Sequence, residues 1–138
     1  MPTEQEWLLA ASGGNAPREY PWGSKYVDGF ANLDERGLLG FLRVGKTYLG
    51  RTTAVGVYLH GQSPCGALDM AGNVWEWTLT EYTSKVSADI TNDRPRVVRG
   101  GSWLNDPDVA RASYRYYYTP DFRDYVIGFR VVVAAPVS

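Results

Sequence analysis

Few side chains in this sequence have the types and spacing of a catalytic or metal site. The chain has one cysteine, Cys65, and one histidine, His60, which excludes an intrachain disulfide and a multi-cysteine zinc site. A catalytic thiol needs an adjacent base, and His60 is expected to be a loop residue. Cys65 is therefore interpreted as a buried or incidental thiol. Glu4 and Glu6 begin a predicted helix, where carboxylates favour the positive end of the dipole, and are not interpreted as a glycosidase pair.

The most unusual stretch is "SYRYYYTPDFRDYV" at residues 113–126. It places four tyrosines in five positions, Tyr114 and Tyr116 to Tyr118, and continues with Phe122 and Tyr125. Neighbouring side chains on a strand point to opposite faces, so three consecutive tyrosines cannot all enter a core. Tyrosine combines a large amphipathic surface and a hydroxyl with only two torsions to order. A recognition surface is therefore favoured over an aromatic-rich core or sheet.

A helix is expected to precede this stretch at the start of the chain. In "PTEQEWLLAASGG", Thr3 is a suitable N-cap and Glu6 lies three residues on, as in a capping box. Gly13 and Gly14 then end the helical pattern. The 15 glycines and the 14% aromatic content indicate many turns, few long helices and burial supplied by large rings.

Strands are predicted from short apolar segments. "VWEWTL" at 74–79 has period-two alternation, and "RVVRGGSW" at 96–103 is interrupted by two glycines, as at a bulge or close backbone approach. Two further strands are predicted at 53–59 and at 127–134, the latter apolar enough to be central. Residues 104–126 show neither period. Because there is no internal repeat or linker, residues 1–138 are interpreted as a single domain of α+β class.

Charge and hydropathy exclude several classes of partner. The formal net charge is -1, and there is no block of lysine and arginine, so a nucleic-acid partner is not expected. No apolar run is long enough to span a bilayer, so no membrane partner is expected. The N-terminal residues lack the order of a signal peptide. The expected location is the cytoplasm.

Three motifs together resemble the formylglycine-generating-enzyme (sulfatase-modifying factor) family, a branch of the C-type lectin fold. They are "PTEQEW" at 2–7, "DMAGNVWEWT" at 69–78, and "RGGSW" at 99–103 followed by "GFRVV" at 128–132. The likeness extends over nearly the whole chain and implies a C-type lectin-like fold of this subtype, with small antiparallel sheets and much irregular loop. It also implies the C-terminal core of a longer protein, which could carry an N-terminal effector domain.

The resemblance does not extend to the catalytic residues of the family. The enzyme uses two cysteines after its "GGSW" motif to hold copper, and here Asn105 and Ala110 occupy those positions. Neither side chain replaces a thiolate as a soft ligand. The related sulfoxide synthases use iron held by histidines, and only His60 is present. A non-catalytic domain without a required cofactor is therefore expected, with a formylglycine-generating-enzyme-like oxidoreductase or a degenerate relative as the alternative.

The C-terminal part resembles the variable region of a diversity-generating retroelement protein. In such systems template adenines are randomised, so that AAC codons become NNC codons, which cannot encode Lys, Glu, Gln, Met or Trp. None of these five residue types occurs from Leu104 to Ser138. The resemblance implies a framework at 1–103 and 127–138, a variable region at 104–126, and a macromolecular ligand expected to be a protein. The implied contact residues are Leu104, Asn105, Asp106, Asp108, Val109, Tyr114, Tyr116, Tyr117, Tyr118, Phe122, Asp124, Tyr125 and Val126.

A structural calcium site is also implied by the family resemblance. Its ligands would be a side chain at Asp69, the carbonyls of Gly72 and Val74, and the carboxylate of Glu76, because hard oxygen ligands suit Ca²⁺. The alternative is that Asp69 and Glu76 bond to local backbone amides. Trp75 and Trp77, in the same segment, are expected to pack in the core, whereas Arg111, Arg115 and Arg123 are expected to support the scaffold.

Overall fold

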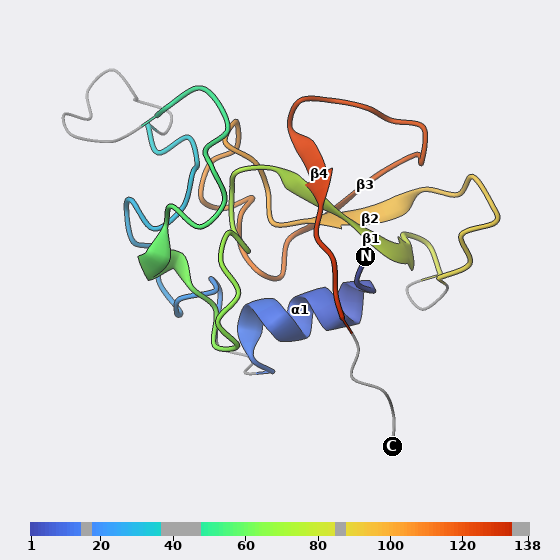
Figure 1. Ribbon diagram of the computed structural model, residues 1–138, viewed down its shortest axis with the longest axis horizontal. Coiled ribbons are helices and arrows are strands. Elements are labelled where there is room, and N and C mark those ends of the chain that lie inside the picture. The colour runs from blue at the N-terminus through green and yellow to red at the C-terminus, as the bar shows by residue number, and fades with distance from the viewer. Residues whose placement is uncertain (15–17, 37–47, 85–87, 134–138) are drawn as a thin grey trace.

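The computed structural model describes residues 1–14, 18–36, 48–84 and 88–133. Short elements joined by long irregular segments make up the fold (Figure 1). In chain order they are α1 (Glu4–Ser12), the 3₁₀ turn η2 (Leu59–Gly61), β1 (Trp75–Glu81), β2 (Arg96–Arg99), β3 (Arg115–Tyr118) and β4 (Ile127–Phe129).

Helix α1 begins and ends as its sequence predicts. The Thr3 hydroxyl accepts a hydrogen bond from the Glu6 amide at 3.2 Å, and a Glu6 carboxylate oxygen accepts one from the Thr3 amide at 2.7 Å. This reciprocal pair is a capping box. At the other end Gly13 adopts a left-handed φ of 66°, a conformation that glycine reaches without a Cβ clash. The predicted helix is confirmed.

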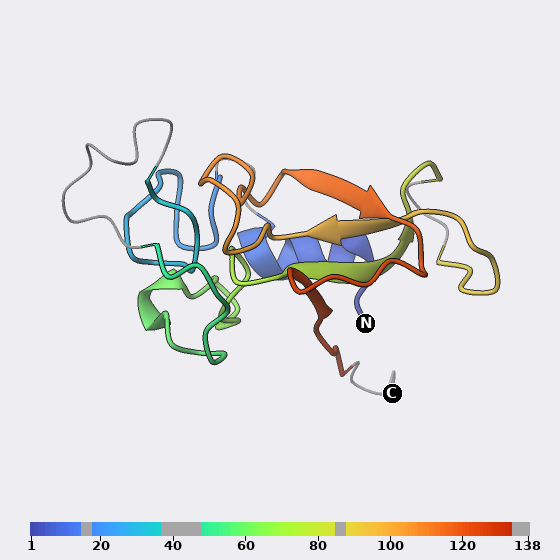
Figure 2. The same cartoon turned by 90° about the horizontal axis from the view of Figure 1, so that it is seen from above.

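The four strands form one mixed sheet in the order β3-β2-β1-β4. β2 is antiparallel to both β1 and β3, whereas β4 is parallel to β1. The register places Trp77 beside Val98, and Val98 beside Tyr116. Figures 1 and 2 show α1 running beside the sheet, where it contacts β1 and β2. One face of the sheet is therefore covered by α1, and the other carries Trp77, Val98 and Tyr116.

The predicted strand at 74–79 is confirmed as β1. β2 covers only Arg96–Arg99 of the strand predicted at 96–103, because it ends at the two glycines that were expected to interrupt it. Both glycines have left-handed φ values, 91° and 72°. A Cβ on Gly100 would lie 3.3 Å from the Met70 carbonyl oxygen and 3.3 Å from the Trp7 ring. The backbone turns there because a side chain would obstruct the approach of these two groups.

Other strand predictions were wrong in part. Residues 53–59 contain turns in place of a strand, and Gly56 has a φ of 79°. β4 covers only Ile127–Phe129 and lies at an edge, not at the centre; residue 134 lies outside the described residues. Val131 is 74% exposed, so apolar character there does not reflect burial. β3 was not predicted, because its segment shows no hydrophobic periodicity: its aromatic rings occupy both faces of an edge strand.

The apolar core is divided into small clusters. One joins α1 to the loop before β1 through Trp7, Ala11, Met70 and Ala112. Another contains Trp75, Val98, Trp103 and Val126. The predicted core position of Trp75 is confirmed by its 5% exposure, whereas Trp77 is only partly buried. Within the described ranges, no helix combines the length and hydropathy of a transmembrane segment.

Candidate binding surface

The rings of β3 are placed by strand geometry on two sides of the sheet. Tyr116 lies 6.2 Å from Trp75 between ring centroids, and Tyr118 lies 6.3 Å from Trp77. Tyr117 points the other way and packs on Tyr82 with centroids 4.3 Å apart. Because β3 is an edge strand, Tyr116 and Tyr117 still stack on each other at 5.4 Å. The consecutive tyrosines therefore form one ring cluster around the strand edge.

The cluster continues into the flanking loops. Tyr118 stacks on Phe122 with centroids 4.0 Å apart and planes 4° apart. Before the strand, Tyr114 packs on Trp75 at 6.1 Å, and beyond it Tyr125 packs on Trp103 at 5.9 Å. We call the following set the tyrosine surface: Tyr114, Tyr116, Tyr117, Tyr118, Phe122 and Tyr125.

Members of the tyrosine surface are neither buried nor fully exposed. The exposed fractions are 39% for Tyr114, 43% for Tyr116, 41% for Tyr117 and 70% for Tyr125, whereas Tyr118 and Phe122 are half-buried. Burial raises the pKa of the Tyr118 hydroxyl, and the nearby Tyr116 and Asp124 raise it further. The Tyr118 phenol is therefore neutral at pH 7 and can donate or accept hydrogen bonds.

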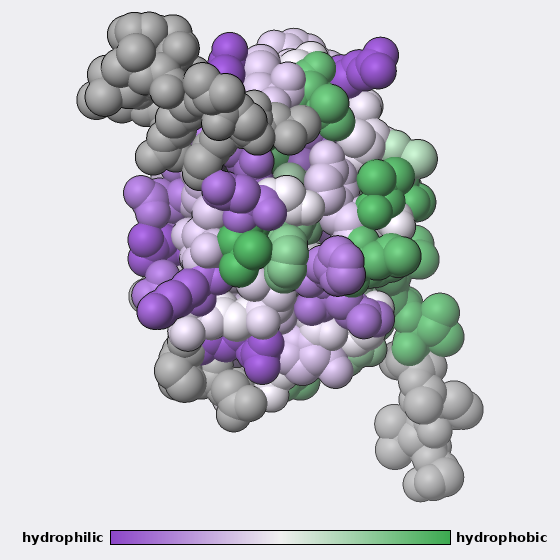
Figure 3. Space-filling model, turned by 90° about the vertical axis from the view of Figure 1, so that its left-hand side faces the viewer, coloured by the Kyte–Doolittle hydropathy of each residue, from purple (hydrophilic) through white to green (hydrophobic). Residues whose placement is uncertain are grey.

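Exposure alone does not single out this surface. Val55, Leu59 and Val131 are 84%, 66% and 74% exposed. The face drawn in Figure 3 is mostly hydrophilic, with apolar side chains gathered along its right margin. What distinguishes the tyrosine surface is the series of direct ring contacts among its members and with the tryptophans beneath them.

The backbone before β3 is held by a buried arginine. Arg99, 2% exposed, donates to the carbonyl oxygens of Ala112, Ser113 and Tyr114 at 2.6, 3.1 and 2.8 Å. Burial lowers the pKa of Arg99 to about 10, which the nearby Glu4 carboxylate partly opposes. The guanidinium therefore stays charged at pH 7. These bonds involve main-chain atoms only, so they do not depend on which side chains the segment carries.

Glu4 connects the same network to the strand. Its carboxylate accepts two hydrogen bonds from Arg115, both at 2.8 Å, and lies 3.4 Å from Arg99. Arg115 also lies over the Tyr82 ring at 4.6 Å. Arg111 pairs with Glu19 and Asp108, and Arg123 donates to two nearby carbonyls. The three arginines predicted to support the scaffold thus contact acidic groups or main-chain oxygens.

The remaining predicted contact residues divide by their surroundings. Leu104, Asp106, Asp108 and Asp124 are exposed. Asn105 is half-buried, and its side-chain oxygen accepts from the amide and hydroxyl of Ser102 at 2.9 and 2.8 Å, so it stabilises a turn.

Two valines of the predicted set lie in or against the core. Val109 is half-buried and packs against the Trp75 cluster. Val126 is only 9% exposed and belongs to that cluster. The prediction that Val126 contacts a ligand is therefore corrected, because its side chain fills the core beneath the surface.

Tyr82 was missed from the sequence, although its ring packs directly on Tyr117. It follows β1, and β2 lies between β1 and β3 in the sheet. No local spacing signals a contact between such distant segments. The only hint in the sequence is that Tyr82 directly follows an aromatic-rich strand that begins at Trp75.

The residues of the implied calcium site do not fit a cation. The Glu76 carboxylate accepts from Trp7 Nε1 at 2.6 Å and from Arg130 Nε and Nη2 at 2.6 Å each. Arg130 Nη2 also donates to the carbonyls of Leu68 and Asp69. The Asp69 carboxylate accepts from the Gly56 amide at 2.6 Å. Arg130 therefore bonds to both Glu76 carboxylate oxygens that would face calcium, whereas the Asp69 carboxylate is held by the Gly56 amide.

Asn105 and Ala110, the two positions that the resemblance equates with the family's copper ligands, carry no thiol. Ala110 is fully buried and Asn105 is bonded to Ser102. Cys65 is exposed, which rules out the buried thiol that was one interpretation. Its Sγ lies 3.3 Å from the Ser63 hydroxyl, which lowers the pKa of the thiol. His60 stacks on Phe30 at 5.6 Å. Among the residues that the structure describes, no three His, Cys, Asp or Glu side chains gather as metal ligands.

Comparison with known proteins decides the family. The sulfatase-modifying factor enzyme 1-like domain matches residues 1–135. The chain belongs to this family. It is 34% identical to the inactive C-alpha-formylglycine-generating enzyme 2 of Bos taurus, over 98% of this chain and 44% of that protein. It is also 34% identical to the hercynine oxygenase of Mycobacterium tuberculosis, over 95% of this chain and 31% of that protein. The domain therefore spans less than half the length of these relatives.

A solved structure extends the comparison to the variable region. The domain resembles Treponema denticola variable protein 1 with a TM-score of 0.69 and 27% identity, over 94% of this chain and 45% of that one. The α+β class, the C-type lectin-like fold and the predicted resemblances to the family and to a variable protein are confirmed. Because the relatives include both an inactive protein and an enzyme, family membership alone does not assign catalysis.

Proposed function

We propose that the domain is a non-catalytic binding module of a retroelement-diversified variable protein, and that its tyrosine surface recognises a protein ligand. The observation that carries this proposal is the cluster of partly exposed rings around the edge strand β3, packed on buried tryptophans. Such rings provide large contact area at small entropic cost. Tyrosine is also enriched at positions that dominate binding energy.

The Arg99 network supports the same proposal. Arg99 bonds to main-chain oxygens at residues 112–114, so side chains at 114 and 116–118 can change without loss of those bonds. We propose that residues 104–126 vary within a framework of 1–103 and 127–138. Val126 is the exception, because its side chain packs in the core. An N-terminal effector domain and a cytoplasmic location remain predictions.

A displayed library tests the proposal without a known ligand. NNC codons would replace those for Tyr114, Tyr116, Tyr117 and Tyr125, and binders would be selected against several unrelated proteins. We expect most members to fold and distinct binders to emerge for each target. A control library at framework positions of similar exposure, Val27, Leu49, Val57 and Leu59, should yield none. If most members of the first library failed to fold, the proposal would be wrong.

The gene's surroundings provide a second test. We expect a reverse-transcriptase gene nearby and a template repeat that differs from the codons for residues 104–126 only where the template has adenine. Differences at other bases, or the absence of any repeat in a complete genome, would contradict diversification. They would leave a binding role without this mechanism.

The alternative is an oxidoreductase, and the similarity to hercynine oxygenase favours considering it. It requires a metal near Trp103 despite the residues at 105 and 110. Titration with copper or iron, followed by an assay on a cysteine-containing peptide, tests it. Turnover that survives Cys65→Ala would establish an enzyme and overturn the binding proposal.

A further inference from the structure

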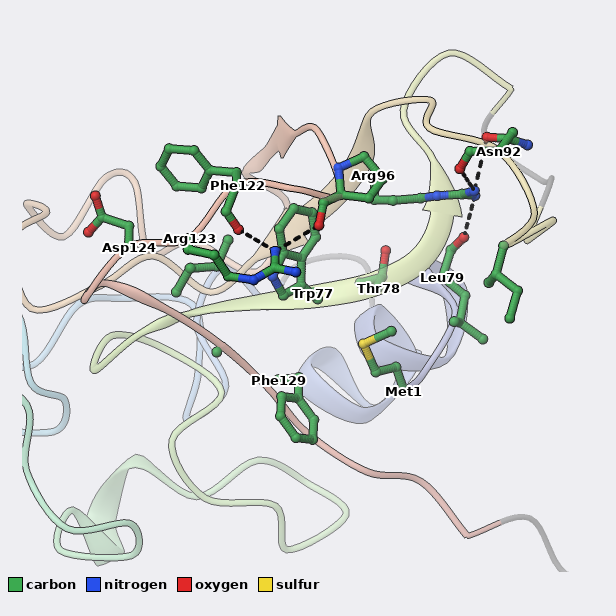
Figure 4. Close-up of a pocket in the computed structure, with 14 residues that line it drawn as sticks. Met1, Trp77, Thr78, Leu79, Asn92, Arg96, Phe122, Arg123, Asp124 and Phe129 are labelled. Carbon is green, nitrogen blue, oxygen red and sulfur yellow. Dashed lines mark hydrogen bonds between the residues drawn. The ribbon is translucent and has the colours of Figure 1, made fainter.

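A groove of about 570 Å³ adjoins the tyrosine surface. Figure 4 shows its walls, which come from Met1, from β1, from the segment leading into β2, and from residues 120–129. Its size is within the range of about 300–1,000 Å³ typical of ligand sites. The last pair of residues between β1 and β4 is Trp77 with Phe129. The groove forms beyond that pair, beside Thr78 and Leu79 of β1.

Most of the groove wall is apolar and open to solvent. Ile90 is 72% exposed and Phe129 67%, whereas Trp77, Phe122 and Ile127 are half-buried. Contact with a ligand would remove this area from water, at about 25 cal/mol per Å² of apolar surface. Phe122 stacks on Tyr118 at 4.0 Å, so the groove is continuous with the tyrosine surface.

One cation in the groove has donors to spare. Arg123 Nη1 donates to the carbonyls of Pro120 and Phe122 at 2.7 and 2.8 Å, which fixes the guanidinium. Its Nε and Nη2 have no hydrogen bond to any residue in the described ranges, and the side chain is exposed. An arginine fork of this kind matches a carboxylate.

The other charged groups of the groove are already engaged. Arg96 is 7% exposed in its side chain and donates to Leu79 O at 3.1 Å and to Asn92 Oδ1 at 3.1 Å. An Asp124 oxygen accepts from the Val126 amide at 3.1 Å, and Figure 4 shows this carboxylate pointing away from Arg123. Among the described residues that line the groove, Arg123 is therefore the cation available to a ligand, and the neighbouring Asp121 carboxylate also interacts with it.

We propose that this groove binds an extended segment of the protein ligand in which a bulky apolar side chain lies beside a carboxylate. The apolar side chain would pack between Trp77, Ile90 and Phe129, and the carboxylate would accept from Arg123. This inference rests on the proposed binding function. It adds a contact made mainly by framework residues, because only Phe122 and Asp124 of the groove belong to the predicted contact set.

Recognition would then have two parts. Trp77, Ile90 and Phe129 of the framework select ligands that present an apolar side chain. Arg123 lies within residues 104–126 but is a scaffold arginine outside the predicted contact set, so it selects an acidic group whichever residues occupy the contact positions. The tyrosine surface next to the groove distinguishes among those ligands. Such a division allows the predicted contact positions within residues 104–126 to vary while part of the binding energy stays constant.

Short blocked peptides test the groove directly. The probes are acetyl-Gly-Phe-Glu-Gly-amide, its Gln analogue without the charge and its Ala analogue without the ring, titrated while the Trp77 indole N–H is followed by NMR. We expect saturable binding of the first with a dissociation constant on the order of 1 mM. The Gln analogue should bind about fivefold weaker, and the Ala analogue at least about tenfold weaker.

Variants locate the binding. Ile90→Ser should weaken the Phe-Glu peptide about fivefold or more. Arg123→Gln should remove the preference for Glu over Gln, and Arg123→Lys should retain part of it. Matched controls are Val57→Ser, at 57% exposure, and Arg94→Gln, an exposed arginine paired with Glu81; both should bind like the parent. Unchanged unfolding midpoints confirm that each variant is folded.

Several results would overturn the inference. Absence of saturable binding, or binding indifferent to Ile90→Ser and Arg123→Gln, would exclude this site. Equal binding of free 3-phenylpropionate would indicate a small-molecule pocket, and concentration-dependent dimers that Ile90→Ser dissociates would indicate a second copy as the occupant. If the displayed library yields binders while the peptides fail, only this inference falls. If the peptides bind while the library fails, the groove is a constant peptide site and the diversified function is wrong.

Discussion

The two faces of the four-stranded sheet are built from different kinds of interaction. The face covered by α1 holds charged side chains with directed hydrogen bonds: Glu4 to Arg115, Arg99 to three carbonyls, and Glu76 to Arg130. The opposite face holds rings in contact at centroid distances of 4.0 to 6.3 Å. Tyr117 is the exception, because it packs on Tyr82 on the other side of β3. Buried ionic bonds require one geometry and one partner, whereas ring contacts tolerate many arrangements.

This difference separates the residues that fix the backbone conformation from those that can be replaced by other side chains. Arg99 and Glu76 are 2% and 7% exposed, and losing either leaves charged or polar partners unpaired in a buried site. Tyr116 and Tyr117 are about two-fifths exposed, and losing either exposes a neighbouring ring to water. The comparison predicts that stability depends on the buried charged network of the α1 side and binding on the partly exposed rings of β3 and its flanking loops.

The largest expected effect is from Arg99→Leu. It leaves the carbonyls of Ala112, Ser113 and Tyr114 without their buried donor, so we expect a loss of about 3–5 kcal/mol in unfolding free energy, measured by urea denaturation. Arg94→Leu is the control, since Arg94 is 66% exposed in its side chain, and should cost at most about 1 kcal/mol. Similar losses of unfolding free energy for the two variants would contradict the special contribution of the buried charged network to stability.

Arg130→Leu should have the next largest effect. Glu76 would keep only Trp7 as a donor, and because Arg130 is partly exposed we expect a loss of about 2–3 kcal/mol. The parent protein should keep the same melting temperature in EDTA and in millimolar calcium. If calcium but not magnesium raised the parent's melting temperature, calcium would be displacing Arg130 from the Glu76 carboxylate.

Tyr116→Ser and Tyr117→Ser should each cost only about 1 kcal/mol, because their rings are partly exposed and lose mainly one or two ring contacts. Trp75→Ser, at a position 5% exposed, should cost about 3–5 kcal/mol in the same denaturation experiment. A tyrosine loss as large as that of Trp75 would place these rings in the core and contradict the binding proposal.

The smallest expected effect concerns pH and the capping box. Hydrogen bonds from the Thr3 amide and hydroxyl lower the pKa of Glu6. A depressed carboxyl pKa adds stability that is present above the unfolded value of about 4.3 and is lost as pH falls through the folded value. Glu6→Gln should therefore flatten the stability profile below about pH 5, with a change of a few tenths of a kcal/mol at pH 7. An unchanged slope would exclude this contribution.

Local patterns were sufficient for α1 and β1. A capping box and a terminal glycine act within a few residues of the helix, and the alternation of Trp75, Glu76 and Trp77 needs no distant information. The strand expected at 53–59 failed because strand propensity has no effect without a partner to pair with. β3 was missed for the opposite reason: β2 pairs with it, although its own residues show no alternation.

The amino-acid sequence established the family, the helix, the aromatic segment and its partial exposure, because motifs, caps and face alternation are properties of neighbouring residues. Which groups the aromatic segment contacts depended on the folded chain. Arg99 reaches residues 112–114, Tyr117 meets Tyr82 across β2, Val126 enters the core, and Arg130 takes the Glu76 carboxylate. These pairings join segments far apart in sequence, and their free energy comes from burial and geometry that exist only after the strands assemble.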